Sequence, residues 1–440
     1  MHHDQATTPD AEPSPSRTMD HMVSPATATT LDSPAVARPR RRRGWLWLVL
    51  TLVTLSLIGV GYPCMKWYQG EQLETACRQA LRAKNWEQLA TLAARYSDWQ
   101  SQQAAPWMYR AQAAHELGQI AESADYLDRL PDRDRRTPAA LLERATLLFG
   151  PLNRPLEAEQ TCLRALRLNP SLVEAHRRLI YFYAFTLQRQ KMVAQIRKAI
   201  EYECDLPETY VYLLSQDWLS FGNAYQENTK WMQSDRDSEL FLVARAIYRV
   251  TTQGLDEKPD NDTVVVDDDT DGLPYHRKVL QGYFEKFPQN LELLVFYLRQ
   301  ASNDGDQEQV EQLLAQAPAA AAQDNRFWRY QGWLHQARGE LAEAEESYQT
   351  ALKLNPYDYI SPHQLAAVLR RRQAPKEVID ELERRYQEGS KLRREILALP
   401  DVTKAPPGLL TRIAEHAVLC GEGQTAEQLL RRLELMRRMR

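Results

Sequence analysis

The stretch Asn325–Pro356 constrains the fold of this chain more than any other, because it encodes two short helices joined by a turn. Gly339 interrupts the first helical pattern. After it, side chains recur at steps of three, four and three residues, at Leu341, Ala344, Tyr348 and Ala351. This spacing places all four on one face of a helix with about 3.6 residues per turn. Pro356 then ends the predicted second helix.

The same pattern recurs elsewhere in the chain. Trp107 precedes Gly118 by the same distance as Trp328 precedes Gly339. The segment 156–170 repeats the spacing of the second helix. A single hairpin of two helices cannot bury both of its faces, so such a unit needs neighbours. The recurrence therefore predicts an array of stacked helical hairpins.

The unit at Asn325–Pro356 resembles a tetratricopeptide repeat, whose motif is Trp-x2-Leu-Gly-x2-Tyr, then Ala-x3-Phe and Pro. The residues that match this motif are Trp328, Gly332, Ala344, Tyr348 and Pro356. Gln331 and His335 stand where the motif has Leu and Tyr. The small residues at 332 and 344 would let the two helices approach closely. The resemblance implies an all-α solenoid over 66–253 and 275–440, with a polar capping helix at the C-terminus.

Charge and motifs argue against two classes of function, nucleic-acid binding and catalysis. The net charge is -4 and the pI is about 6.2, so nothing in the charge balance supports nucleic-acid binding. The chain contains no Gly-rich phosphate loop, no HExxH and no GxSxG. A helical-toroid hydrolase would need a pair of acidic side chains in a deep pocket, and no residue pattern predicts one. We expect a chain that is not an enzyme.

The N-terminal part contains a long apolar run. Residues 1–43 are rich in Pro, Ser, Thr and Ala, end in a cluster of arginines and are predicted to be disordered. Residues 44–65 follow without a charged side chain and could span a bilayer as a helix. A signal peptide fits poorly, because no small-x-small cleavage site follows. A lipoprotein signal also fits poorly, because Tyr62 and Pro63 precede Cys64. A buried soluble helix is the remaining alternative.

The expected location of the protein follows from the predicted transmembrane helix over 44–65. Arginines beside a membrane span stay on its cytoplasmic side. We therefore expect a single-pass membrane protein in which the tail 1–43 is cytoplasmic and the repeats after Met65 are extracytoplasmic.

An acidic insertion, 254–274, interrupts the helical pattern. It holds Asp267, Asp269 and Asp271 at alternate positions, followed by a glycine. Three carboxylates with this spacing can surround Ca²⁺, and the glycine permits a sharp turn. A complete EF-hand loop would need a bidentate Glu where this chain has Lys278. Two interpretations stay open, a solvated acidic loop and a weak calcium site.

Four aromatic residues lie close together between the repeats, at Tyr181, Phe182, Tyr183 and Phe185. They cover more than one face of a helix. We interpret them as packing between repeats, and the alternative is that they form part of a binding surface.

The family resemblance also implies where a partner would bind. In tetratricopeptide repeats the first helix of each hairpin lines a concave groove that receives a peptide or a partner helix. The residues predicted to face this groove are Arg326, Arg329, Trp333 and Gln336, with Met108, Gln112 and His115 in the earlier repeat. Arginine and tryptophan are frequent in interface hot spots. For Trp333, packing against the next helix is an equal alternative.

Together these features predict a membrane-anchored scaffold that binds another protein or a peptide, without catalysis and without a cofactor. The alternative is a calcium-responsive adhesion or envelope-assembly module that uses the acidic insertion as its switch.

Overall fold

The computed structural model describes residues 42–219, 223–253 and 275–438, and the regular structure in these ranges is helical throughout. The helices before the acidic insertion are α1 Arg42–Arg82, α2 Trp86–Trp99, α3 Ala104–Glu116, α4 Ile120–Asp128, α5 Thr137–Phe149, α6 Pro155–Leu168, α7 Val173–Phe185, α8 Arg189–Glu201, α9 Pro207–Leu214, α10 Ala224–Trp231 and α11 Glu239–Gln253. Those after it are α12 Tyr275–Lys286, α13 Leu291–Asp304, α14 Gln307–Gln316, η1 Ala319–Gln323, α15 Asn325–Arg338, α16 Leu341–Leu354, α17 Ile360–Arg371, α18 Lys376–Leu397, η2 Val402–Lys404, α19 Pro407–Leu419 and α20 Gly423–Arg438. The predicted all-α fold is confirmed.

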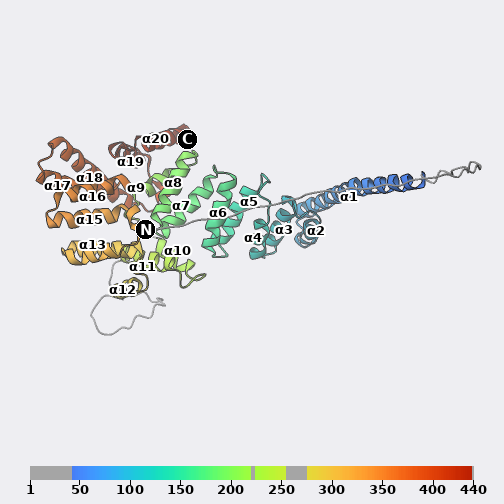
Figure 1. Cartoon of the computed structure of the whole chain (residues 1–440), viewed down its shortest axis with the longest axis horizontal. Coiled ribbons are helices and arrows are strands. Elements are labelled where there is room, and N and C mark those ends of the chain that lie inside the picture. The colour runs from blue at the N-terminus through green and yellow to red at the C-terminus, as the bar shows by residue number, and fades with distance from the viewer. Residues whose placement is uncertain (1–41, 220–222, 254–274, 439–440) are drawn as a thin grey trace, which may run out of the picture. The chain divides into compact units, whose positions relative to one another are not determined.

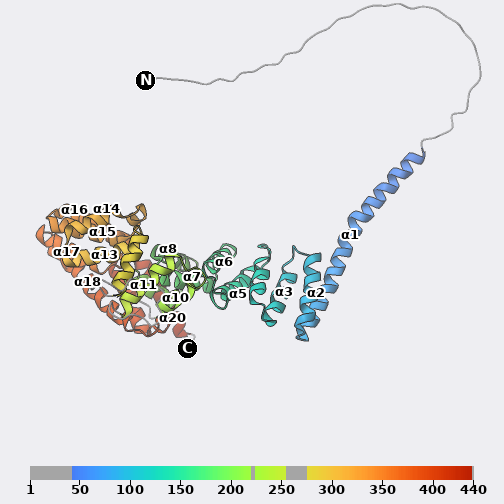
Figure 2. The same cartoon turned by 90° about the horizontal axis from the view of Figure 1, so that it is seen from below.

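Consecutive helices pack as hairpins, and each hairpin packs on the next. The pairs with extensive contact include α3 with α4, α5 with α6, α7 with α8, α15 with α16, α17 with α18, and α19 with α20. Figure 2 shows the helices from α2 to α6 following one another in chain order. This arrangement is the solenoid of helical hairpins that the recurring pattern predicts.

The close approach predicted between α15 and α16 is present. Tyr348 and Ala344 are fully buried on α16. A Cβ atom added to Gly332 would lie 2.8 Å from Cδ1 of Tyr348, closer than real side chains come. The Tyr348 hydroxyl donates a hydrogen bond to Oε1 of Gln336 at 2.9 Å. Glycine at 332 is therefore required by the packing of the tyrosine ring.

Many of the hairpin turns contain one residue with left-handed backbone angles. In four turns it is a glycine, with φ of 75° to 81°, at Gly118, Gly305, Gly339 and Gly421. In four others it is a different residue, with φ of 52° to 58°, at Lys84, Asn153, Leu187 and Gln373. Glycine adopts this conformation without a steric cost, whereas other residues do so at some expense. The same turn conformation therefore forms with glycine and with other residues, and only the turns with glycine can be recognised from the sequence.

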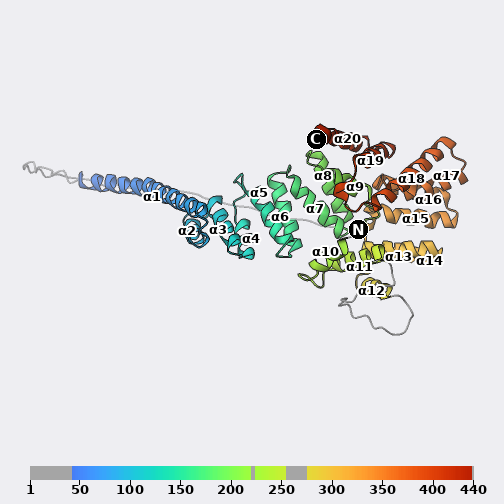
Figure 3. The ribbon, with the colours of Figure 1, turned by 180° about the vertical axis from the view of Figure 1, so that it is seen from behind.

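Helix α9 departs from simple stacking. It contacts α7 and α8 on the one hand and α19, α20 and η2 on the other. Figures 1 and 3 show α9 between these groups of helices. Its side chains are buried almost without exception, among them Tyr210 and Val211. One hydrophobic cluster therefore joins α7 to α12 with the end of α18, α19 and α20.

The predicted membrane topology is wrong. The structure places the apolar run 44–65 inside a longer helix, α1, which continues as one helix to Arg82 through a charged second half. Among the helices that the structure describes, none is long and apolar enough to cross a membrane. This finding overturns both the transmembrane helix predicted over 44–65 and the single-pass localisation with extracytoplasmic repeats.

Two predicted segments lie outside the described residues. They are most of the N-terminal tail, 1–41, and the acidic insertion, 254–274, with Asp267, Asp269 and Asp271. The calcium site and the calcium-responsive alternative stay predictions.

Candidate functional site

The structure buries two of the residues that were predicted to line a groove. The side chains of Arg326 and Arg329, on α15, are 3% and 6% exposed. Nη1 of Arg329 donates to Oδ2 of Asp217 and to Oδ1 of Asp358, each at 3.0 Å. Arg329 is therefore engaged by two carboxylates of its own chain.

Arg326 belongs to the same group of buried charges. Its Nη2 lies 2.6 Å from Oδ2 of Asp324 and 2.6 Å from Oε1 of Glu292. Glu292, in the first turn of α13, also accepts from Nε of Arg189 at 2.9 Å, so that one carboxylate joins α8, α13 and α15. Arg189 donates in turn to the backbone carbonyl of Gln216. The buried ionic network consists of Arg189, Gln216, Asp217, Glu292, Asp324, Arg326, Arg329 and Asp358.

The charged groups of this network shift one another's pKa values. Burial, and then the adjacent carboxylate of Asp358, raise the pKa of Asp217. Burial alone would also raise the pKa of Glu292, but Arg189 and Arg326 lower it to about 2. Glu292 is therefore ionised at neutral pH and balances two buried arginines.

The segment that covers Arg329 is the turn after α9. The side-chain amides of Asn325 and Asn355 donate to Asp217 at 2.8 and 2.9 Å. Before α9, Asp205 accepts from Nη2 of Arg432 on α20 at 3.0 Å. The turn after α9 therefore lies against Arg329, which was predicted to contact a partner.

The other two predicted residues of α15 are half-buried. Trp333 packs against the hydrophobic cluster that includes Leu298 and Phe327, which agrees with the packing alternative for this side chain. Gln336 accepts the hydrogen bond from Tyr348. Partner binding through Trp333 and Gln336 stays a prediction.

The predicted residues of the earlier repeat lie on α3. Met108 packs against the cluster formed by α3, α4 and α5, and Nε2 of Gln112 donates to Glu116 at 3.0 Å. His115 is exposed near the end of the helix. Helix α3 packs on α2 and α4, whereas α15 packs on α13, α14, α16 and α17, so the two predicted sets belong to different groups of helices. Their role in binding stays a prediction.

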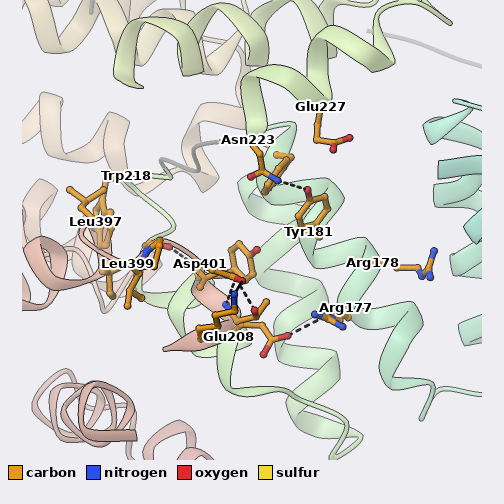
Figure 4. Close-up of a pocket in the computed structure, with 18 of the residues that line it drawn as sticks. Arg177, Arg178, Tyr181, Glu208, Trp218, Asn223, Glu227, Leu397, Leu399 and Asp401 are labelled. Carbon is orange, nitrogen blue, oxygen red and sulfur yellow. Dashed lines mark hydrogen bonds and ion pairs between the residues drawn. The ribbon is translucent and has the colours of Figure 1, made fainter. Parts of the chain in front are cut away.

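A pocket of about 800 Å³ lies between α7, α9, α10 and the segment from the end of α18 to η2 (Figure 4). Its volume falls within the range that is usual for ligand sites. Aromatic and apolar side chains line it together with charged groups. We call it the α7–α10 pocket.

One wall of the α7–α10 pocket comes from the aromatic cluster on α7. Tyr181 and Phe185, one turn apart, stack with ring centroids 3.8 Å apart, and both line the pocket. Phe182 and Tyr183 point into the core, where Phe182 meets the Trp231 ring edge-on at 5.3 Å. Two rings of the cluster therefore pack between helices and two line the pocket, and a role of these two in binding stays a prediction.

The charged side chains of the pocket are largely paired with one another. On α7, Nε of Arg178 lies 2.8 Å from Glu174. Nε of Arg177 lies 3.3 Å from Glu208, in the first turn of α9. Figure 4 shows this pair below Tyr181, whose hydroxyl accepts a hydrogen bond from Asn223 at 3.1 Å.

The opposite wall is apolar and comes from distant parts of the chain. Trp218 lies in the turn after α9, whereas Leu397 and Leu399 lie at the end of α18. Leu397 is 42% exposed, so a bound molecule could reach it. Reasoning from the sequence missed these residues, because each is an ordinary apolar residue until the fold brings the two segments together.

Residues 326–358 match the family model of the tetratricopeptide repeat. They cover α15 and α16, so the resemblance of this unit is confirmed. No curated protein matches the chain.

Several solved structures of helical repeat proteins resemble the chain. A tetratricopeptide repeat protein from Parabacteroides merdae is 12% identical over 60% of this chain and 98% of that chain, with a TM-score of 0.28. The Cut9–Hcn1 hetero-tetramer of the APC/C is 10% identical over 88% of both chains, with a TM-score of 0.33. A thermophilic tetratricopeptide repeat protein from Thermus thermophilus is 19% identical over 41% of this chain and 98% of that chain, with a TM-score of 0.22.

Proposed function

We propose that the chain binds a segment of a partner protein and that the α7–α10 pocket receives it. Tetratricopeptide repeats generally mediate protein–protein interaction, and one unit of this chain matches their family model. The observation that carries the proposal is the pocket of about 800 Å³, whose walls hold the aromatic rings of Tyr181 and Trp218. These residue types dominate the energy of protein interfaces. We also propose that the chain does not catalyse a reaction.

The α7–α10 pocket is a better candidate than the groove predicted along α15. Arg326 and Arg329 are occupied by carboxylates of the same chain, and releasing them would leave buried charges without partners. In the pocket, by contrast, Leu397 is exposed and Trp218 is half-buried. A partner can cover these side chains without breaking an existing ion pair.

The proposal can be tested with peptides selected against the full-length chain from a random display library. Binding of the selected synthetic peptides is measured by fluorescence anisotropy with the wild type and with Leu397→Asn. The substitution removes one apolar contact from the pocket wall, so we expect about tenfold weaker binding.

A matched control is Leu117→Asn, because Leu117 is 39% exposed at the end of α3, far along the chain from the pocket residues. This variant should bind the peptides like the wild type. Equal binding by Leu397→Asn and Leu117→Asn would show that the pocket is not the binding site.

A further inference from the structure

The charges of the α7–α10 pocket are unequal. Its lining holds four carboxylates, Glu174, Glu208, Glu227 and Asp401, against three cationic side chains, Arg177, Arg178 and Lys404. Each cation already has a carboxylate partner within the lining. Arg177 contacts Glu208 and Glu174, Arg178 contacts Glu174, and Nζ of Lys404 lies 3.5 Å from Asp401. The surplus is therefore negative.

The carboxylate left over is that of Glu227. It lies in the first turn of α10 and makes no hydrogen bond or ion pair with any residue in the described parts of the chain. Figure 4 shows Glu227 near Tyr181 and Asn223, without a dashed contact of its own. Burial, and then the charge of Glu227, raise the pKa of Tyr181, which places this charge close to the aromatic wall.

The apolar groups of the pocket lie on another side. In Figure 4, Trp218, Leu397 and Leu399 form a group away from Glu227. A ligand that fills the pocket thus meets a half-buried anion at one end and exposed apolar surface at the other. An acidic ligand would be repelled by the surplus charge, whereas a cation would be attracted.

We infer, resting on the proposed function, that the partner segment carries a Lys or Arg side chain close to a large apolar side chain. The cation pairs with Glu227, and the apolar side chain lies against Trp218, Leu397 and Leu399. Burial of the apolar group supplies affinity, and the charge pair supplies selectivity. The arginines of α7 do not take part, because their own carboxylates hold them in the wall.

The test uses the peptides selected from the random library. We expect Lys or Arg near an aromatic or aliphatic residue to be enriched in them. For one such peptide, replacing the cation by Gln should weaken binding to the wild type about tenfold. With Glu227→Gln, the two peptides should bind alike, because the pair is already broken. Glu346→Gln is the matched control, because Glu346 is exposed on α16 and the substitution removes the same charge.

The outcomes separate the inference from the proposed function. If the peptides lose affinity for Leu397→Asn but show no dependence on a cation or on Glu227, the pocket binds and the inference is wrong. If Glu227→Gln and Glu346→Gln weaken binding equally, the effect is one of net charge and the inference is also wrong. If Leu397→Asn binds like Leu117→Asn, the proposed function itself fails.

Discussion

Arg329 and Asp217 form a buried ion pair at 3.0 Å although 112 positions separate them in the chain. The pair joins the unit that matches the tetratricopeptide repeat to the turn after α9. Asp358 shares the same guanidinium group at 3.0 Å. Three segments are therefore held together by one arginine, at a place where the repeat pattern predicts an open groove.

Removal of Arg329 should destabilise the protein strongly. In Arg329→Ala, the carboxylates of Asp217 and Asp358 stay buried without their counter-charge, which costs about 3–5 kcal/mol. Urea unfolding followed by circular dichroism measures the change. Arg338→Ala is the control, because its pair with Glu311 is exposed and should contribute little. Similar unfolding midpoints for the two variants would contradict the structural role of the buried ionic network.

Glu292 should make stability depend on pH in the acidic range. Its pKa is about 2 in the folded protein against an ordinary value of 4.5, because Arg189 and Arg326 favour the charged form despite burial. The ionised carboxylate thus contributes roughly 3 kcal/mol above pH 4.5, and this contribution is lost as the pH falls from 4.5 towards 2. Glu292→Gln should be less stable than the wild type at neutral pH, and the difference should shrink across this window. A difference that is constant between pH 7 and pH 3 would be inconsistent with this account.

A methyl group at position 332 should not fit. Gly332→Ala places its Cβ against the fully buried ring of Tyr348, and overpacking of this kind costs about 1–3 kcal/mol. Gly282→Ala is the control, because a Cβ at that position on α12 meets no atom within 4 Å. Alanine should even stabilise α12, by up to about 1 kcal/mol, through its helix propensity. Thermal unfolding of both variants tests the contrast, and equal shifts would disprove the packing argument.

The left-handed turn residues allow a pair of opposite substitutions. Gln373 is exposed and has a φ of 57°, so Gln373→Gly should stabilise the α17–α18 turn by about 1 kcal/mol. Gly339 has a φ of 81° in the α15–α16 turn, and Gly339→Gln should destabilise it by a similar amount. Changes of the same sign in chemical denaturation would refute the assignment of the two turns to one conformation.

The helical class and the repeat at α15 could be predicted, because the spacing of Ala344 and Tyr348 and the turn at Gly339 follow from local geometry. The left-handed backbone conformation of Leu187 and Gln373 could not, since neither residue is a glycine. The repeat boundaries over 208–253 also stayed open, because no clear repeat signature marks them.

The candidate site depends on contacts between distant segments, and this explains why it could be predicted only in part. Two rings of the α7 cluster line the pocket, and the sequence offered a binding surface there as an alternative. Glu227 and Leu397 carry no local signal, because the pocket that both line forms only when distant segments of the chain come together. The burial of Arg329 could not be predicted from the sequence either, because its partner Asp217 lies outside the repeat that contains Arg329.

The position of α9 has a consequence for how this architecture can change in length. The helices α1 to α4 bury their side chains in two local clusters, so a hairpin duplicated or deleted there would leave the remaining interfaces intact. Beyond α8, adding or removing a hairpin would separate buried ion pairs that join distant helices. These pairs include Arg189 with Glu292 and Arg329 with Asp217. We therefore expect the fold to tolerate a change in the number of hairpins before α5 better than a change after α8.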